Sequence, residues 1–329
     1  MAQKVHHIDP ATNASAVLPE GGGGSGAALA PVTPIKAAGR RRARSTPRGR
    51  RSASRTGGPR TAFVLSGGAS LAALQAGTLR ALYELDISPD LLVATSAGAI
   101  NATFVASRPQ TVATARELAG IWRSLTRDHI FPLSPWVLAR GLLGKRDHLV
   151  AADGLRSVLG GHLEFADLAD APIPLHAVAF DIDTGTEVLL SEGPTLDVLT
   201  ATSAIPGVFP PVSLGGRRLI DGGIVNNTPI SHAVELGAER VYVLPTMESS
   251  FAGPVQKRAA LGAATDALGV MMRRQFQADI ARFSSEVELI VLPAPNRLAV
   301  MPTDFGHADR LVRDGFRAAR QRLAQPLAA

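Results

Sequence analysis

Residues 91–101 read Leu-Leu-Val-Ala-Thr-Ser-Ala-Gly-Ala-Ile-Asn (LLVATSAGAIN), an apolar run that leads directly to a serine. LLVAT predicts a buried strand, and AGAINATFVAS, which follows Ser96, predicts a helix. A serine at a sharp strand-to-helix turn stands clear of the sheet, and small neighbours let the two backbones approach closely. The stretch therefore predicts a nucleophile elbow of the G-x-S-x-G type around Ser96. Ala94 replaces the first glycine, and Ala94 and Gly98 are the expected supporting residues.

A near-copy of this motif, ATSA, occupies residues 201–204 in a different context. Ser203 lies within a helical stretch, has Ile205 two positions later instead of a glycine, and is soon followed by Pro206. The near-copy lacks both the preceding strand and the small residue that an elbow needs. We therefore predict a structural role for Ser203.

The sequence from residue 61 to 325 alternates short apolar runs with segments of helical periodicity. This alternation predicts an α/β fold with a mainly parallel central sheet and helices on both faces. No long linker interrupts it, so we expect one domain over 61–325. The expected strands are 61–66, 91–95, 174–182, 187–191, 217–223, 240–246 and 287–294. The expected helices are 71–86, 97–107, 111–126, 152–159, 196–203, 229–237, 255–282 and 307–324.

Two further motifs follow expected strands. Residues 66–70 (SGGAS) form a glycine-rich turn into a helix, where successive N–H groups can point at one anion. The turn has neither the lysine of a P-loop nor the spacing of a dinucleotide fingerprint, so an oxyanion hole suits it better. Asp221 ends the strand RRLID and is followed by Gly222 and Gly223. Because the carboxyl ends of parallel strands share one edge of a sheet, we expect Ser96, the glycine loop and Asp221 to meet there.

The amino-terminal segment has a separate character. Residues 1–60 carry eleven basic residues against two acidic ones, a charge of +9, whereas the rest of the chain carries −3. This Arg-, Gly-, Ala- and Pro-rich segment buries too little apolar surface to fold, so we predict a disordered tail. A solvated tail is the simplest interpretation; contact with anionic lipid or nucleic acid, and organelle targeting, are alternatives, and nucleic acid is not favoured as a partner.

Residues 127–150 break the α/β rhythm, because they are apolar but rich in Pro and Gly. They predict either an insertion packed on the surface or a lid over an apolar cleft that can touch lipid. The chain has no cysteine, no run long enough to span a bilayer and no secretory signal layout. We therefore expect a cytoplasmic protein with, at most, peripheral membrane contact. No ligand spacing suggests a metal site, and no cofactor is expected.

Four motifs together resemble the patatin-like phospholipase family, in the order and approximate spacing of that family. They are LSGGASLAALQAGTLRAL (65–82), LLVATSAGAIN (91–101), ATSAIPGVFPPV (201–212) and LIDGGIVNNTPI (219–230). Residues 179–190 and 301–320 also look like bacterial members, so the resemblance covers about 61–325.

The resemblance implies a three-layer α/β/α fold and a Ser–Asp dyad without histidine. Ser96 would be the nucleophile and Asp221 its general base. The N–H groups of Gly67, Gly68 and Ala69 would form the oxyanion hole. The family's loop often reads G-G-G-x-R-G. In this sequence Ala69 stands at the third glycine of that pattern, Leu71 at the arginine and Ala72 at the last glycine.

These features predict a serine hydrolase that frees fatty acids from phospholipid or other acyl-ester lipids. To act as the general base, Asp221 needs a pKa that burial raises towards neutrality. The altered glycine loop supports an alternative, a weak or inactive member that binds lipid or a protein partner. A third hypothesis gives the main function to the basic tail, as a surface adaptor. His232 and His307 follow Ser96 in the chain, but their helical contexts favour packing or surface roles over a triad.

Overall fold

The computed structural model describes residues 58–132, 148–247, 260–295 and 300–325. Their strands are β1 (Thr61–Leu65), β2 (Leu91–Thr95), β3 (Leu175–Asp181), β4 (Thr186–Leu190), β5 (Val212–Leu214), β6 (Arg217–Asp221), β7 (Arg240–Leu244) and β8 (Glu288–Val291). Their helices are α1 (Ala73–Tyr83), α2 (Ala97–Ala106), α3 (Val112–Ser124), α4 (Arg127–Ile130), α6 (Asp153–Gly160), α7 (Thr195–Thr202), α8 (Gly223–Asn226), α9 (Ile230–Glu235), α10 (Ala260–Phe283) and α11 (Ala308–Leu323). Two short 3-10 helices cover Ala69–Ala72 and Leu168–Asp170.

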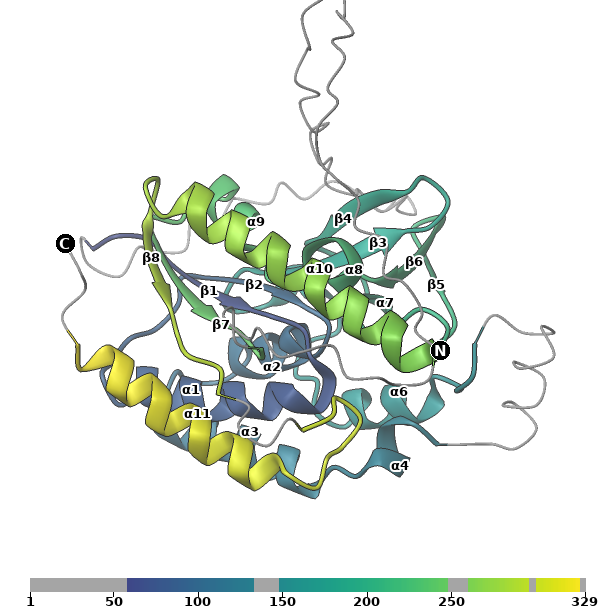
Figure 1. The fold of residues 1–329 in the computed structure, drawn as a ribbon, viewed down its shortest axis with the longest axis horizontal. Coiled ribbons are helices and arrows are strands. Elements are labelled where there is room, and N and C mark those ends of the chain that lie inside the picture. Colours follow the sequence, from purple (N-terminus) through teal and green to yellow (C-terminus); the bar gives the residue numbers. More distant parts are fainter. Residues whose placement is uncertain (1–57, 133–147, 248–259, 296–299, 326–329) are drawn as a thin grey trace, which may run out of the picture. The chain divides into compact units, whose positions relative to one another are not determined.

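The described residues form an eight-stranded sheet in the order β5-β6-β3-β2-β1-β7-β8, with β4 paired to β3 (Figure 1). Strands β3, β2, β1, β7 and β8 are parallel to one another. Strands β4, β5 and β6 join antiparallel. The expected mainly parallel α/β sheet is therefore confirmed.

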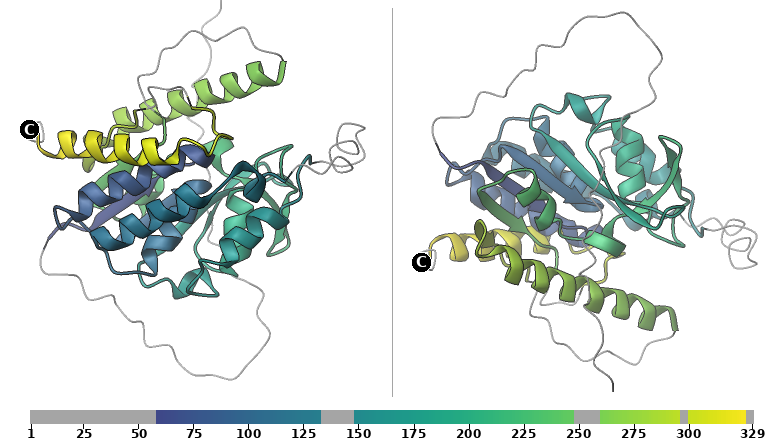
Figure 2. Two further views of the ribbon diagram at one scale, coloured as in Figure 1. Left: turned by 90° about the horizontal axis from the view of Figure 1, so that it is seen from below. Right: turned by 90° about the horizontal axis from the view of Figure 1, so that it is seen from above.

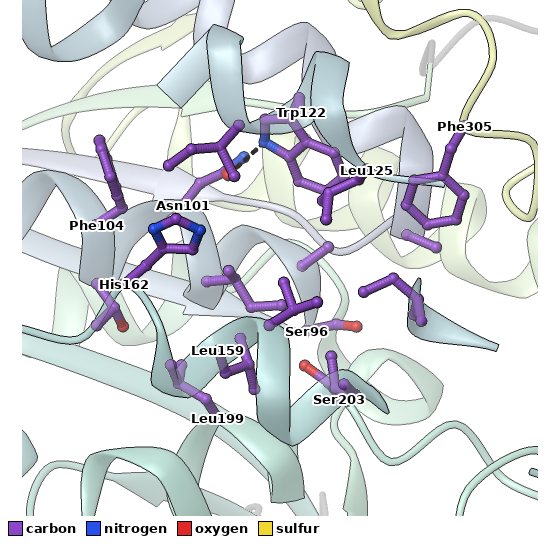
Figure 3. A pocket seen from close by; sticks show the side chains of 18 of the residues that line it. Ser96, Asn101, Phe104, Trp122, Leu125, Leu159, His162, Leu199, Ser203 and Phe305 are labelled. Atoms are coloured by element: carbon purple, nitrogen blue, oxygen red, sulfur yellow. Dashed lines mark hydrogen bonds between the residues drawn. The ribbon is translucent and has the colours of Figure 1, made fainter. Parts of the chain in front are cut away.

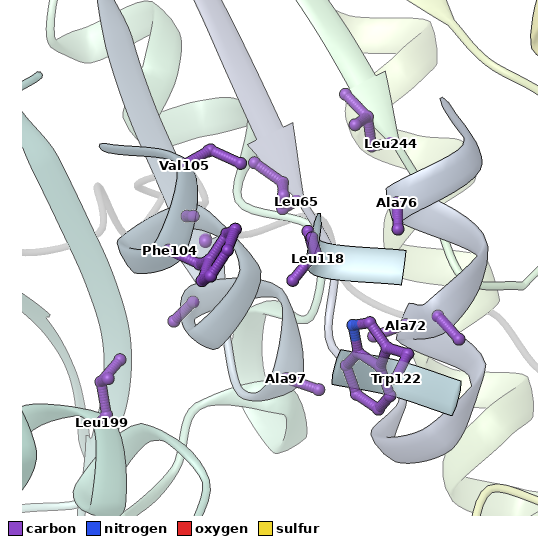
Figure 4. Packing of buried hydrophobic residues seen from close by; sticks show 14 of the residues in the cluster. Leu65, Ala72, Ala76, Ala97, Phe104, Val105, Leu118, Trp122, Leu199 and Leu244 are labelled. Atoms are coloured by element: carbon purple, nitrogen blue, oxygen red, sulfur yellow. The ribbon is translucent and has the colours of Figure 1, made fainter. Parts of the chain in front are cut away.

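The two faces of the sheet bury separate apolar clusters. Along β1, Phe63 and Leu65 point to the cluster that includes α1, α2, α3 and α11, whereas Ala62 and Val64 point to the cluster under α9 and α10. This alternation follows from the two-residue period of a strand, and full burial of both faces explains why TAFVL reads as continuously apolar. Figures 1 and 2 show α10 on one side of the sheet and α1, α3 and α11 on the other, which makes the three layers. Figure 4 shows Leu65 and the alanines Ala72, Ala76 and Ala97 around Phe104 and Trp122 in the first cluster.

Strand β6 departs from the expected arrangement, because it is not one of the parallel strands. It runs antiparallel to β3 and pairs with the stretch of β3 that lies just beyond the end of β2. Thr95 at the end of β2 lies opposite Val178, and Asp221 at the end of β6 lies opposite the next residue, Ala179. The carboxyl ends of β2 and β6 therefore meet head to head along one side of β3.

One strand was not predicted. Val212–Leu214 forms β5, which pairs with β6 through a tight hairpin. Gly215 and Gly216 both have positive φ, 58° and 78°, as a two-residue type I′ hairpin loop requires. The Gly-Gly pair before RRLID was the sequence signal for this hairpin.

Two predicted segments lie largely outside the described residues. Most of the tail, residues 1–57, and the central part of the 127–150 insertion, residues 133–147, belong to the undescribed part of the chain.

Candidate active site

Ser96 lies at the sharp turn between β2 and α2, as the sequence predicted. Its backbone has φ 54° and ψ −129°, a conformation that residues with a side chain rarely adopt and that costs about 1–3 kcal/mol. The turn is held from both sides: the Ser96 N–H donates to Thr202 Oγ1 at 3.0 Å, and the Ser96 carbonyl accepts from the Ala99 N–H at 2.8 Å. The strained turn presents the hydroxyl beyond the end of the sheet.

The expected supporting residues of the elbow are both buried. A Cβ at Gly98 would lie 2.3 Å from the Leu65 carbonyl oxygen and 2.6 Å from that of Ser66, so any larger residue would push α2 away from β1. Ala94 is fully buried in the apolar cluster, opposite Leu65 in the sheet register. The methyl group at position 94 is therefore accommodated, whereas a methyl group at position 98 is not.

The Ser96 hydroxyl donates a 2.7 Å hydrogen bond to Oδ2 of Asp221, and both residues are buried. Asp221 is the last residue of β6, and its own N–H donates to the Ala204 carbonyl at 3.0 Å. Burial raises the pKa of Asp221 to about 6, although the hydrogen bonds from Ser96 and from the Gly223 N–H oppose this rise. A carboxylate with a pKa near 6 can accept a proton from a serine at neutral pH more readily than an ordinary aspartate.

The two glycines after Asp221 contribute to the site in different ways. A Cβ at Gly222 would lie 2.5 Å from the Val178 carbonyl oxygen, so the chain passes too close to β3 for a larger residue. The Gly223 N–H donates to Oδ1 of Asp221 at 2.7 Å and so fixes the carboxylate that Ser96 contacts.

The glycine-rich loop leaves two adjacent N–H groups without an acceptor among the described residues, those of Gly68 and Ala69. The neighbouring N–H groups are occupied: Ser66 donates to Leu244, Gly67 to Asn227, Ser70 to Pro302 and Leu71 to Gly68. Gly67 was expected to supply an oxyanion donor, but its N–H is already bonded to the Asn227 carbonyl at 3.2 Å. Gly68 and Ala69 are therefore the loop's available donors.

Ala69, the residue at the family's third glycine, has a positive φ of 48°. The position is thus one that favours glycine, and the alanine costs about 1 kcal/mol there. The loop nevertheless keeps this shape, because its neighbours are anchored. The Gly67 carbonyl accepts from Thr246 Oγ1 and Asn227 Nδ2, and Ser70 bonds to residues 301 and 302.

The near-copy motif contributes structure, and one of its residues was missed by the sequence analysis. Ser203 is the C-cap of α7, and its buried hydroxyl has no hydrogen-bond partner among the described residues. Thr202 beside it accepts the Ser96 N–H and donates to the Val178 carbonyl. The motif therefore stabilises the turn at Ser96 through its threonine. The sequence analysis missed this threonine because no local pattern distinguishes it from a helix-packing residue.

The two histidines considered for a triad have other contacts. His232 is buried on α9 and bonds through its two ring nitrogens to Glu187 at 2.6 Å and Glu235 at 3.2 Å. His307 caps α11 and lies 3.4 Å from Asp304. Within the described part of the chain, neither histidine bonds to Ser96 or Asp221.

Ser96 opens onto an apolar pocket on the α1–α3 side of the sheet (Figure 3). Ala69 and Ser203 also line it, and its polar members include Asn101 and Thr103, whose side chains are occupied by bonds within the protein. The apolar wall consists mainly of Ile100, Phe104, Leu118, Ile121, Trp122, Leu125, Leu155, Val158, Leu159, Leu163, Leu199, Phe209 and Phe305.

The described ends of the 127–150 insertion contribute to this pocket. Ile130 and Phe131 line it, and Phe131 stacks on Phe209 with 5.4 Å between ring centroids. Phe131 also packs against Phe305, so segments far apart in sequence close one side of the pocket.

No group of three or more His, Cys, Asp or Glu side chains in the described part of the chain has the arrangement of a metal site. No described helix combines the length and the apolar character needed to cross a membrane.

Comparison with known proteins gives consistent matches. The family model for patatin-like phospholipase matches residues 63–234, just over half of the chain. An uncharacterized NTE family protein of Mycobacterium tuberculosis is 30% identical over 200 residues, which are 60% of this chain and 52% of that protein. Patatin-like phospholipase domain-containing protein 7 of Mus musculus is 27% identical over 191 residues, 56% of this chain and 13% of that protein.

The chain thus spans about half the length of the first of these relatives. Among solved structures, VipD from Legionella pneumophila aligns with a TM-score of 0.45 at 15% identity, over 80% of this chain and 66% of that one. The family match contains the elbow, the glycine loop and the Asp-Gly-Gly turn. This chain belongs to the patatin-like phospholipase family.

Proposed function

We propose that this protein hydrolyses acyl esters of lipids, with Ser96 as nucleophile and Asp221 as general base. The observation that carries the proposal is the 2.7 Å bond between the two side chains, at the wall of an apolar pocket. Family membership supports the same reaction class.

The first half of the reaction forms an acyl-enzyme. Asp221 takes the proton of Ser96 while Oγ attacks the ester carbonyl carbon. The N–H groups of Gly68 and Ala69 stabilise the resulting oxyanion, and each such donor is worth roughly 3–4 kcal/mol of barrier. When the tetrahedral intermediate collapses, the alcohol leaves with the proton that Asp221 holds.

The second half releases the fatty acid. Water gives a proton to Asp221 and attacks the acyl-enzyme carbonyl, and the same N–H groups stabilise the second oxyanion. Collapse frees the acid, and Ser96 recovers its proton from Asp221. The apolar wall of the pocket suits the hydrocarbon part of the substrate, because its burial there is favourable.

The substrate class we propose is phospholipid or another acyl-ester lipid, and Ile130 and Phe131, at the described start of the 127–150 insertion, line the pocket that would hold its acyl chain. Contact of the basic tail with an anionic membrane surface is part of this proposal, because eleven basic residues lie within residues 1–60.

The test compares the full-length wild type with Ser96→Ala and Asp221→Asn on p-nitrophenyl esters and on phospholipid vesicles. We expect each variant to lower kcat by at least about 10³-fold, as for residues that act as one catalytic unit. Ser107→Ala and Asp181→Asn are matched controls, because both alter side chains outside the pocket and the dyad. If both dyad variants keep wild-type turnover, the mechanism is wrong. If the wild type is inert on every ester, the lipid-binding alternative replaces it.

A further inference from the structure

A chain of three buried side chains runs from the pocket wall to the glycine-rich loop. Trp122 Nε1 donates to Asn101 Oδ1 at 2.8 Å, and Asn101 Nδ2 donates to Gln75 Oε1 at 2.9 Å. Gln75 and Asn101 are fully buried, and Trp122 is nearly so. Figure 3 shows the bond between Asn101 and Trp122 at the pocket. Each amide oxygen faces an N–H donor, which fixes the orientation of both amides.

The two amides of this hydrogen-bonded network also bond to the backbone on both sides of the glycine loop. Gln75 Nε2 donates to the carbonyls of Ser66 and Leu244, each at 2.9 Å. Asn101 Nδ2 also donates to the carbonyl of Ala72 at 3.0 Å. Ser66 and Ala72 bracket residues 67–71, and both N–H donors and the oxygen of each amide have a partner. A fully satisfied buried network of this kind is rigid.

This network adds to the bonds that anchor Gly67 and Ser70, and two other positions of the loop make the added support important. The residue at the arginine of the family pattern is Leu71, which is buried and offers no side-chain hydrogen bond. Ala69 holds a positive φ that an alanine disfavours. A donor stabilises an oxyanion only if it is already aimed at the right point, so small shifts of the Gly68 and Ala69 N–H groups are costly for catalysis.

We propose that Gln75, Asn101 and Trp122 are positioning residues for the oxyanion donors. This neutral hydrogen-bonded network fixes the loop in a protein whose sequence lacks the arginine of the family pattern. The inference rests on the proposed hydrolase function. It assigns to this amide network an effect on the transition state, because its bonds reach the backbone on both sides of the oxyanion donors, at Ser66 and Ala72.

The experiment measures kcat and KM of the full-length protein on a p-nitrophenyl ester, per active site titrated with a fluorophosphonate. Gln75→Met and Asn101→Leu remove the amides with similar side-chain volumes, and Trp122→Phe removes only the terminal donor and part of the ring. Thr78→Val is the matched control, since it deletes a buried hydroxyl on α1 whose bond within the described structure stays inside the helix, to Leu74. A trifluoromethyl ketone, whose serine adduct carries an oxyanion, reports on the loop without turnover.

For Gln75→Met and for Asn101→Leu we expect kcat to fall about 10- to 100-fold with KM within about twofold, somewhat less than the loss of a whole oxyanion donor. Affinity for the trifluoromethyl ketone should fall by a similar factor. The double variant should lose little more than the worse single variant, because both changes break one chain. Trp122→Phe should lower kcat about 3- to 10-fold, and Thr78→Val should leave it unchanged.

Wild-type kcat in the folded Gln75 and Asn101 variants overturns the inference, and so does an equal loss in Thr78→Val. If Gln75→Met and Asn101→Leu do not fold, Trp122→Phe decides alone, and unchanged kcat and ketone affinity overturn the inference. Failure of the proposed function looks different: the wild type itself would then neither turn over ester nor react with the fluorophosphonate.

Discussion

The hydroxyl of Ser96 and the carboxylate of Asp221, 125 residues apart in sequence, form a 2.7 Å hydrogen bond inside the protein. The bond exists because β2 and β6 end head to head against β3, at Val178 and Ala179. Each partner is further fixed by its own backbone bond, Ser96 to Thr202 and Asp221 to Ala204. The pair is therefore held by the sheet and not by a mobile loop.

The pH dependence of activity should follow Asp221. Its pKa is raised to about 6 by burial, and only the ionised carboxylate can accept the serine proton. We expect kcat/KM to rise with pH, with a midpoint near 6 and a plateau above it. A pH–rate profile on a substrate that does not itself ionise in this range checks this, and a midpoint near 4 would contradict the assigned environment.

The free energy of unfolding should also depend on the ionisation of Asp221. It should fall as pH rises, whereas activity should increase. Because the folded pKa lies above the ordinary value of 3.8, folding favours the protonated form, and this stabilisation is lost as pH rises from about 4 through 6. Asp221→Asn should therefore raise the free energy of unfolding at pH 8 by on the order of 2–3 kcal/mol, and much less at pH 4. Urea denaturation at both pH values measures this, and an equal effect at the two would argue against ionisation as the cause.

Replacing Ala69 by glycine should relieve the strained loop. The free energy of unfolding should rise by up to about 1 kcal/mol, because glycine tolerates the positive φ of 48°. The loop anchors remain, so kcat should change less than about twofold. Asp86→Gly is the control: Asp86 has φ 56° but lies in the turn after α1, and its replacement should give a similar gain in stability. A tenfold loss of kcat in Ala69→Gly would show that the methyl group itself is needed.

Adding a methyl group at Gly98 should damage the elbow. The new Cβ would meet two backbone oxygens within 2.6 Å, which cannot move aside as a flexible side chain would. We expect Gly98→Ala to cost about 1–3 kcal/mol of stability and to lower kcat at least about 100-fold through displacement of Ser96. A Cβ at Gly120 on α3 would have no described atom within 4 Å, so Gly120→Ala should stabilise the protein by about 0.5–1 kcal/mol with unchanged turnover. Near-normal activity of Gly98→Ala would show that the elbow tolerates movement of α2.

Substitutions at two adjacent residues of the near-copy motif should change the stability of the protein in opposite directions. Ser203→Ala removes a buried hydroxyl that has no partner in the described part of the chain and should stabilise the protein by about 1 kcal/mol, with kcat within about threefold of wild type. Thr202→Val removes the acceptor of the Ser96 N–H and the donor to Val178, and should cost about 1–3 kcal/mol and reduce kcat. Thermal unfolding and ester turnover of the two variants separate these effects. A large loss of activity in Ser203→Ala would instead assign that hydroxyl a part in the reaction.

Much of the fold could be predicted because its signals are local. LLVATSAGAIN encodes strand, turn and helix in contiguous residues, and the observed β2 and α2 match it closely. The short β5 was missed, because three residues before Gly215-Gly216 are too few for a periodic pattern. The direction of β6 was also missed, since an apolar run has the same appearance in a parallel and an antiparallel strand.

The sequence by itself determined the alternation of the main strands and helices, the strand–turn–helix around Ser96 and the presence of a carboxylate and a glycine loop at chain turns. Only the tertiary structure decided that Asp221 reaches Ser96, that Gly67 donates to Asn227 while Gly68 and Ala69 remain available, and that Gln75 and Asn101 grip the loop. The physical reason is that backbone preference and periodicity act over a few neighbouring residues. Hydrogen-bond partners, burial and the resulting pKa of Asp221 instead depend on segments brought together from distant parts of the chain.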